Sequence, residues 1–432
     1  MSPGSLSPMF PGSLSDFDFI GANLTRMGAI LDLHTDDSHK LRALCTPAPL
    51  LRTLKLRISH RNGQASFLPD GLLGGSEGLL GGSEGLPELR HLSVVTWDAL
   101  SFASLRLPQL VSVDISYFGL AMPTPVRVST FAALGRMPAL ERLALRFWPE
   151  DAARVPVTLL PALQHLSLVM NSVSSARRLL AHLGLPAGVR IFYDSGYTDK
   201  LPTFFATMNA CFVARPAPIV RVDIKLAAPN RKFPEDERDV EVGAWRSGDT
   251  DGAPALMVRL RGWEHVAGVL RSLASTHLEA VAVGGDAPDA AWLDALRIAP
   301  GIHRVTVKGG LVPPFCAALE RAPGVLPALS TLVINVHAHP FAKTILQDTL
   351  PRLLTARASA GISLRELAVV GYDEDEACMH VLREAVPGLV VRWCWEAEPE
   401  DEDEDEDEDS ENIIDSDFGP MDLDFSSSED EE

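Results

Sequence analysis

The segments LERLAL at residues 140–145 and LQHLSL at residues 163–168 follow one pattern. In both, the first, fourth and sixth residues are apolar, and the residues between them are mostly polar. Alternation with a period of two predicts a β-strand that buries one face. The pattern recurs in thirteen segments, at residues 51–56, 89–94, 110–115, 140–145, 163–168, 186–191, 219–224, 255–260, 278–283, 302–307, 329–334, 364–369 and 386–391.

Helix-like stretches separate these predicted strands. Short strands that alternate with helical connections every 20–29 residues or so are typical of leucine-rich repeats. The predicted fold class is therefore α/β: an irregular leucine-rich-repeat-like solenoid, with a curved parallel sheet and helices on the convex side. It is irregular because the fourth-position residues lie 21 to 38 residues apart. Residues 22–395 are assigned to the solenoid, and residues 1–21 and 396–432 are predicted to be disordered.

The net charge of −20 is concentrated at one end of the chain. From Glu396 onward there are 21 acidic residues and no Lys or Arg, which leaves 37 acidic and 38 basic residues in the rest of the chain. Such a tail cannot offset its chain entropy by burying apolar surface. Its last serines have an acidic residue three positions later, which makes them candidate phosphorylation sites: Ser426, Ser427 and Ser428.

Three stretches resemble the repeat region of F-box proteins from mushroom-forming fungi. They are LCTPAPLLRTLKL (44–56) followed by FLPDGLLGGSEGLLGGSEGLPELRHLSV (67–94), then RRLLAHLGLPAGVRIFY (177–193), and the segment 350–393. The resemblance implies a ubiquitin-ligase substrate receptor, whose repeats hold a target protein. Docking on a cullin-ligase adaptor is expected only if an F-box lies upstream, because residues 1–50 contain no F-box pattern. The alternative is an acidic-tailed nuclear protein that binds histones or other basic partners, since repeats followed by a Glu/Asp tail are similar to the acidic leucine-rich nuclear phosphoproteins.

Strand periodicity also predicts which side chains leave the core. The residues one before, one after and three after each fourth position should line the concave wall. Three of these are acidic, namely Asp114, Asp223 and Glu366, and twelve are basic, namely Lys55, Arg57, Arg142, Arg146, Arg190, Arg221, Lys225, Arg259, Arg261, Arg304, Lys308 and Arg392. The excess of basic residues predicts an acidic or phosphorylated protein partner. The alternative is ordinary solvated charge, and nucleic acid is a weaker expectation because the body is nearly neutral.

Other chemistry has little support in the sequence. We find no phosphate-binding glycine loop, no HExxH pair and no nucleophile elbow, so the expectation is a non-enzymatic protein without a cofactor. His337 and His339 could bind a metal, but no third ligand stands at a suitable spacing. The chain shows no signal peptide and no apolar run long enough for a membrane helix, and its five cysteines are scattered. The expected location is cytoplasmic, nuclear or both, with no membrane partner.

Overall fold

The computed structural model describes residues 30–35, 50–58, 66–67, 88–96, 100–101, 108–118, 124–146, 157–170, 172–195, 201–214, 216–226, 239–249, 252–273, 277–285, 297, 299–337, 339–372 and 376–394. The segments predicted to be disordered, 1–21 and 396–432, lie outside the described residues. The three candidate phosphorylation sites lie outside them as well.

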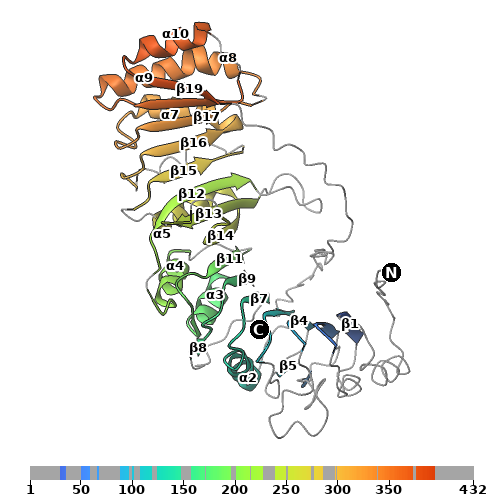
Figure 1. Ribbon diagram of the computed structural model, residues 1–432. Coiled ribbons are helices and arrows are strands. Elements are labelled where there is room, and N and C mark those ends of the chain that lie inside the picture. Colours follow the sequence, from blue (N-terminus) through green and yellow to red (C-terminus); the bar gives the residue numbers. More distant parts are fainter. Residues whose placement is uncertain are drawn as a thin grey trace, which may run out of the picture.

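One sheet of fifteen strands dominates the described part of the chain (Figure 1). In spatial order its strands are β1 (Ile30–Thr35), β2 (Thr53–Ile58), β4 (His91–Thr96), β6 (Ser112–Tyr117), β7 (Arg142–Arg146), β9 (His165–Met170), β11 (Arg190–Ser195), β14 (Leu256–Arg261), β13 (Asp239–Arg246), β12 (Ile219–Leu226), β15 (Ala280–Val283), β16 (Arg304–Lys308), β17 (Thr331–Asn335), β18 (Glu366–Val370) and β19 (Val390–Cys394). Two short parallel pairs lie apart from it: β3 (Ser66–Phe67) with β5 (Leu100–Ser101), and β8 (Thr158–Leu159) with β10 (Leu183–Gly184).

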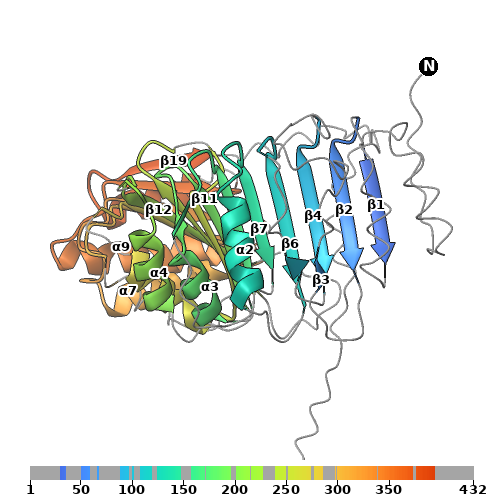
Figure 2. The same cartoon turned by 90° about the horizontal axis from the view of Figure 1, so that it is seen from below.

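The described helices lie on one face of this sheet, along its part from β7 onward (Figure 2). They are α2 (Thr124–Leu134), α3 (Val173–Leu180), α4 (Leu201–Ala210), α5 (Val266–Leu273), α7 (Val312–Arg321), α8 (Ala342–Thr344), α9 (Leu350–Ser359) and α10 (Glu376–Ala385), with single tighter or wider turns at Trp263–His265, Gly309–Leu311 and Ile345–Thr349. The sheet bends near β9, and α2, α3 and α4 lie on the outer side of that bend (Figure 1). The predicted α/β fold with a long, mostly parallel sheet is confirmed.

All thirteen predicted segments lie at strands of the main sheet, but two strands were not predicted. β1 precedes the first recognised segment, and β13 lies between two recognised ones. β13 has the expected alternation, because Val240, Val242 and Ala244 are buried. In the recognised segments an apolar residue stands three positions before the first core residue. In β13 the residue three positions before Val240 is Glu237, so the pattern was incomplete.

The prediction of a wholly parallel sheet is wrong at the centre. β13 pairs antiparallel with both β12 and β14, and β14 rather than β12 lies beside β11. The chain therefore passes from β11 over two strand positions to β12, returns through β13 to β14, and then crosses to β15 beside β12. Antiparallel neighbours need only a short turn, and the β13–β14 turn contains Gly248 with a φ of 98°.

Register across the sheet corrects three of the predicted core positions. Leu166 on β9 is aligned with Ile191 rather than with Val189, and Ile191 is aligned with Leu256 rather than with Val258. At the last strand, Leu367 is aligned with Val391 rather than with Leu389. Each shift is two residues, so it keeps the same side chains on the same face.

The residue before each strand links neighbouring coils. The carbonyl of Arg90 accepts hydrogen bonds from the backbone N–H groups of Val111 and Ser112, at 2.9 and 3.0 Å. The carbonyl of Val111 accepts two in the same way from Glu141 and Arg142, both at 2.9 Å. These paired bonds recur along the parallel strands and hold the amino ends of neighbouring strands level.

The core lies against the face of the sheet that carries the helices. Its two main rows contain apolar residues that are at most 6% exposed from β1 to β18, beginning with Leu31 and Leu33 and ending with Leu367 and Val369. A buried cation, Arg357 on α9, also lies there and donates to backbone carbonyls of the turn after α7. Among the described residues, no helix has both the length and the apolar character needed to cross a membrane.

Candidate protein-binding face

The side chains that alternate with the core residues form the second face of the sheet, opposite the helices, which we call the open face. The predicted basic residues belong to this face by register: Lys55, Arg57, Arg142, Arg146, Arg190, Arg221, Lys225, Arg259, Arg304, Lys308 and Arg392. For Arg261 the structure describes the backbone position at the end of β14 but not the side chain. These residues share one face even where the register is shifted, because a shift of two residues leaves each side chain on the same side of a strand.

The open face contains more acidic residues than the three that were counted from the sequence. Asp32 on β1, Asp194 on β11, and Glu241 on β13 also lie on it. Asp32 and Glu241 were missed because their strands were not predicted, and Asp194 was missed because of the shifted register on β11. The face is accordingly more mixed in charge than the sequence indicated.

At the carboxyl ends of the parallel strands, the basic residues from β7 to β12 have acidic partners. Arg146 lies 3.4 Å from Asp114, and Arg259 lies 2.7 Å from Glu241 and 3.9 Å from Asp194. Lys225 lies 3.3 Å from the other oxygen of Glu241. Five of these residues are aligned in one row across the strands, and we call them the carboxyl-terminal row: Arg146, Asp194, Arg259, Glu241 and Lys225. Asp114 lies outside this row, because it is aligned with Ala144.

Electrostatics in the carboxyl-terminal row follow from these pairs. Burial alone would raise the pKa of Glu241, but its ion pairs with Arg259 and Lys225 bring that pKa below the ordinary value. Burial raises the pKa of Asp114, although the neighbouring Arg146 opposes the change. The carboxylates therefore neutralise much of the positive charge that the sequence placed here.

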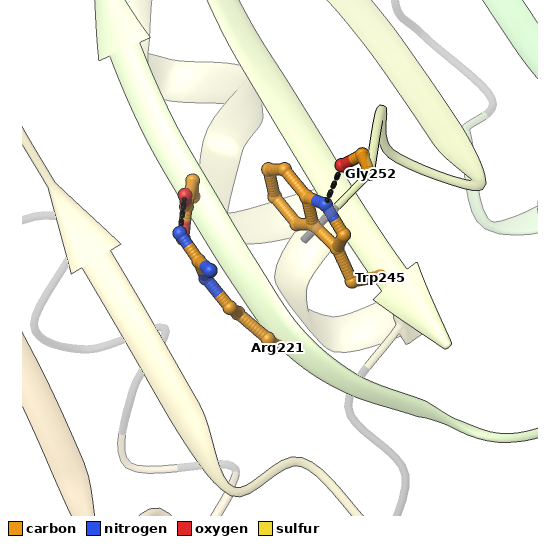
Figure 3. Close-up of polar contacts among 4 residues, drawn as sticks. Arg221, Trp245 and Gly252 are labelled. Carbon is orange, nitrogen blue, oxygen red and sulfur yellow. Dashed lines mark hydrogen bonds and ion pairs between the residues drawn. The ribbon is translucent and has the colours of Figure 1, made fainter. Parts of the chain in front are cut away.

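The antiparallel meander places Trp245 between Arg221 and the turn at Gly252 (Figure 3). Trp245 on β13 donates its indole N–H to the carbonyl of Gly252 at 2.8 Å. The guanidinium carbon of Arg221 lies 4.7 Å from the centre of the Trp245 ring, and Arg221 also binds Asp223 through two nitrogens. A Cβ atom placed on Gly252 would lie 3.4 Å from Nη2 of Arg190, so the side chain of Arg190 also reaches this turn.

The amino ends of the strands carry a different row of charge. Register aligns His91 on β4, Ser112 on β6, Arg142 on β7, His165 on β9 and Arg190 on β11, and we call these the amino-terminal row. Arg142 and Arg190 are exposed, and neither forms an ion pair with another residue in the described part of the chain.

Both histidines of the amino-terminal row respond to the surrounding positive charge. Burial, followed by the charges of Arg142 and Arg90, lowers the pKa of His91. Burial, followed by Arg142 and Arg190, lowers the pKa of His165, and the carboxylate of Glu141 only partly opposes this. The charges of Arg90, Arg142 and Arg190 therefore outweigh that of Glu141 at these two histidines.

The other predicted basic residues are not brought together with this row. Lys55 and Arg57 are exposed on β2, near one end of the sheet, whereas Arg304 and Lys308 lie on β16. Arg392 on β19 pairs with Glu366 at 3.0 Å. The sequence did not indicate which of these basic residues have carboxylate partners.

Toward β19 the open face becomes apolar. Val333 on β17 and Ala368 and Val370 on β18 form a separate small cluster, with exposed fractions of 8%, 9% and 8%. The sequence analysis did not single out these residues. The available signal was the run of consecutive apolar residues in LVI and LAVV.

The structure gives no support to a metal site at the two candidate histidines. β17 ends at Asn335, so His337 and His339 lie beyond the strand, and Nδ1 of His339 accepts the backbone N–H of Phe341 at 3.1 Å. No group of three or more His, Cys, Asp or Glu side chains suited to a metal ion occurs within the described ranges.

Comparisons with known proteins give no family assignment. No family model matches the chain, and no curated protein matches it. A solved structure that it resembles is that of a TLR13–ssRNA13 complex, with 12% sequence identity and a TM-score of 0.31. That match covers 84% of this chain and 47% of the solved chain, so the chain spans about half the length of the structure it matches.

Proposed function

We propose that this chain is a non-enzymatic, leucine-rich-repeat-like solenoid that holds a protein partner on its open face. The observation that supports this most directly is the continuity of that face, because fifteen adjacent strands contribute alternate side chains to one surface. Exposed arginines and a half-buried tryptophan lie together near its middle. Arg and Trp are enriched among residues that contribute most to protein interfaces.

The kind of partner that fits best is an acidic or phosphorylated protein segment. The amino-terminal row attracts anions, whereas a basic partner such as a histone would have to bind elsewhere, for example at the acidic tail. A role as a substrate receptor of the F-box kind fits a target held on the open face. The alternative, a nuclear protein that binds histones through its tail, remains a separate hypothesis.

Affinity purification with the full chain tests this function. Ala282 lies in the middle of β15, aligned with Asp223 on β12 and Thr306 on β16, so Ala282→Trp adds a bulky side chain to the open face. Glu384→Trp on α10 is the matched control, since it adds the same side chain at an exposed helix position.

The expected result is that Ala282→Trp loses partners that Glu384→Trp retains, while both variants keep the melting temperature of the unsubstituted chain. Recovered ubiquitin-ligase subunits would favour the receptor, and recovered histones would favour the alternative. Retention of every partner by Ala282→Trp would contradict binding on the open face.

The acidic tail provides a second test. If residues 396–432 compete for the open face, their removal should strengthen the binding of an acidic peptide at low salt, because the competing charge is gone. The affinity and its salt dependence are measured by fluorescence anisotropy. Unchanged values after the deletion would show that the tail does not compete for this surface.

A further inference from the structure

Arg142, His165 and Arg190 lie side by side on three consecutive parallel strands. Neighbouring strands are about 4.8 Å apart, so the backbones of the two arginines are about 10 Å apart, with the histidine between them. We infer that these three side chains form a site for the oxyanion groups, carboxylate or phosphate, of an acidic segment of the partner protein. This inference rests on the proposed function and makes it specific to one part of the open face.

Charge pairing distinguishes this site from the rest of the face. Arg146 lies on the same strand as Arg142 but at the other end, where Asp114 is 3.4 Å away. A ligand anion would have to displace that carboxylate, whereas Arg142 and Arg190 form no ion pair with a carboxylate among the described residues, and the nearby Glu141 only partly offsets their charge at His165. Formation of a new ion pair is more favourable where no existing pair must be broken.

The donor groups suit oxyanions in number and shape. Each guanidinium group offers five N–H donors in a planar fork, which can bind a carboxylate or phosphate through two hydrogen bonds. A bound anion favours the protonated form of His165, because it opposes the burial and the charges of Arg142 and Arg190 that lower the pKa of this histidine in the free chain. A segment lying across the strands could place one dianionic group, or two single carboxylates, over the three residues.

Trp245 extends the site on the side of Arg190. The turn at Gly252, beside Nη2 of Arg190, is fixed by the hydrogen bond from the Trp245 indole. In Figure 3 the ring of Trp245 lies between Gly252 and Arg221. A half-buried aromatic ring next to an anion site offers apolar contact area to a peptide. The ligand is therefore expected to carry an apolar residue close to its acidic groups.

The test measures binding of labelled peptides to the full chain by fluorescence anisotropy at low salt. The probes are a Glu-Gly peptide, the same peptide with one phosphoserine, and an uncharged Gln-Gly peptide. Arg142→Gln and Arg190→Gln remove the inferred contacts, and Arg146→Gln is the matched control on the same strand. Circular dichroism checks that each variant keeps its fold, and Arg142→Lys tests whether the charge alone is enough.

The expected result is an affinity about tenfold lower for Arg142→Gln and for Arg190→Gln, with less than about a twofold change for Arg146→Gln. Tighter binding of the phosphopeptide assigns phosphate, and equal binding assigns carboxylates; either outcome supports the site. Equal losses in Arg142→Gln and Arg146→Gln would overturn it. Displacement of the peptides by a lower concentration of an RNA oligonucleotide would overturn the assignment to a protein segment.

The same variants separate this inference from the proposed function. If Ala282→Trp loses its cellular partner while Arg142→Gln and Arg190→Gln keep both partner and peptide, the site is refuted and the scaffold function stands. If Ala282→Trp keeps the partner, the scaffold function fails. The peptide measurement needs no cellular partner, so it then decides the anion site independently.

Discussion

Arg357 offers a sharp test of how the carboxyl-terminal half is held together. It lies on α9 with no exposed surface, and its guanidinium donates to the carbonyls of Pro323 and Val325, both at 2.9 Å, and of Leu326 at 3.0 Å. Leu326 has a φ of 57°, a backbone conformation that leucine rarely adopts. The cation therefore holds a strained turn that connects α7 to β17.

Replacement of Arg357 by Met removes all three hydrogen bonds. A hydrogen bond to a charged group contributes about 1.5–3 kcal/mol. The carbonyl of Leu326, a buried residue, would lose this donor, and so would those of the half-buried Pro323 and Val325. Removal of a buried cation recovers several kcal/mol of desolvation free energy, and burial indeed lowers the pKa of Arg357. We expect a net loss of about 3 kcal/mol in the free energy of unfolding.

Arg352→Met is the matched control, because it lies on the same helix. Arg352 is exposed, and its one ion pair among the described residues, with Glu320, is long at 3.7 Å. Its replacement should therefore lower the free energy of unfolding by less than about 0.5 kcal/mol. Urea unfolding followed by circular dichroism measures both variants. Hydrogen exchange locates the loss, since stacked coils can open locally. This role of Arg357 is refuted if the free energy of unfolding of Arg357→Met lies within about 1 kcal/mol of that of the unsubstituted chain. It is also refuted if both substitutions lower the free energy of unfolding equally.

Three further predictions follow from the structure. Acidic-peptide binding should tighten as the pH falls from about 7.5 to 5.5, because the pKa of His165 is below its usual value in the free chain and rises when an anion binds. In the His165→Gln variant, the affinity measured over the same pH range should no longer show this increase. Burial, with a nearby carboxylate, raises the pKa of Cys316 to about 12, so iodoacetamide should alkylate exposed Cys394 well before Cys316, as peptide mass spectrometry would reveal. Gly371→Ala should lower the free energy of unfolding by about 3 kcal/mol, because Gly371 has a φ of 76° and a Cβ atom there would lie 2.7 Å from Cα of His337; an unchanged urea midpoint would contradict this.

Much of the fold could be predicted because the periodic signal is local. LERLAL and LQHLSL became β7 and β9, whose Leu143 and Leu166 are aligned in the same core row. Apolar residues at the fourth and sixth positions bury themselves wherever such a strand packs against a helix layer.

The central meander could not be predicted in the same way. The segments at 219–224 and 255–260 were recognised, yet their spatial order is reversed. Sequence periodicity indicates that a strand exists and which face it buries, but strand order depends on which edges meet in the folded chain. Because β13 was not recognised, the ion pairs of Glu241 with Arg259 and Lys225 could not be predicted from the sequence.

The sequence by itself determined that this protein has a long array of short strands with basic residues on one face, because alternation is a property of neighbouring residues along the chain. Only the tertiary structure decided which of those basic residues meet a carboxylate. Arg142 and Arg146 are four residues apart on one strand, yet their surroundings differ because the partners come from neighbouring strands. Ion pairs across a sheet depend on strand order and register, which distant segments fix when they pack together.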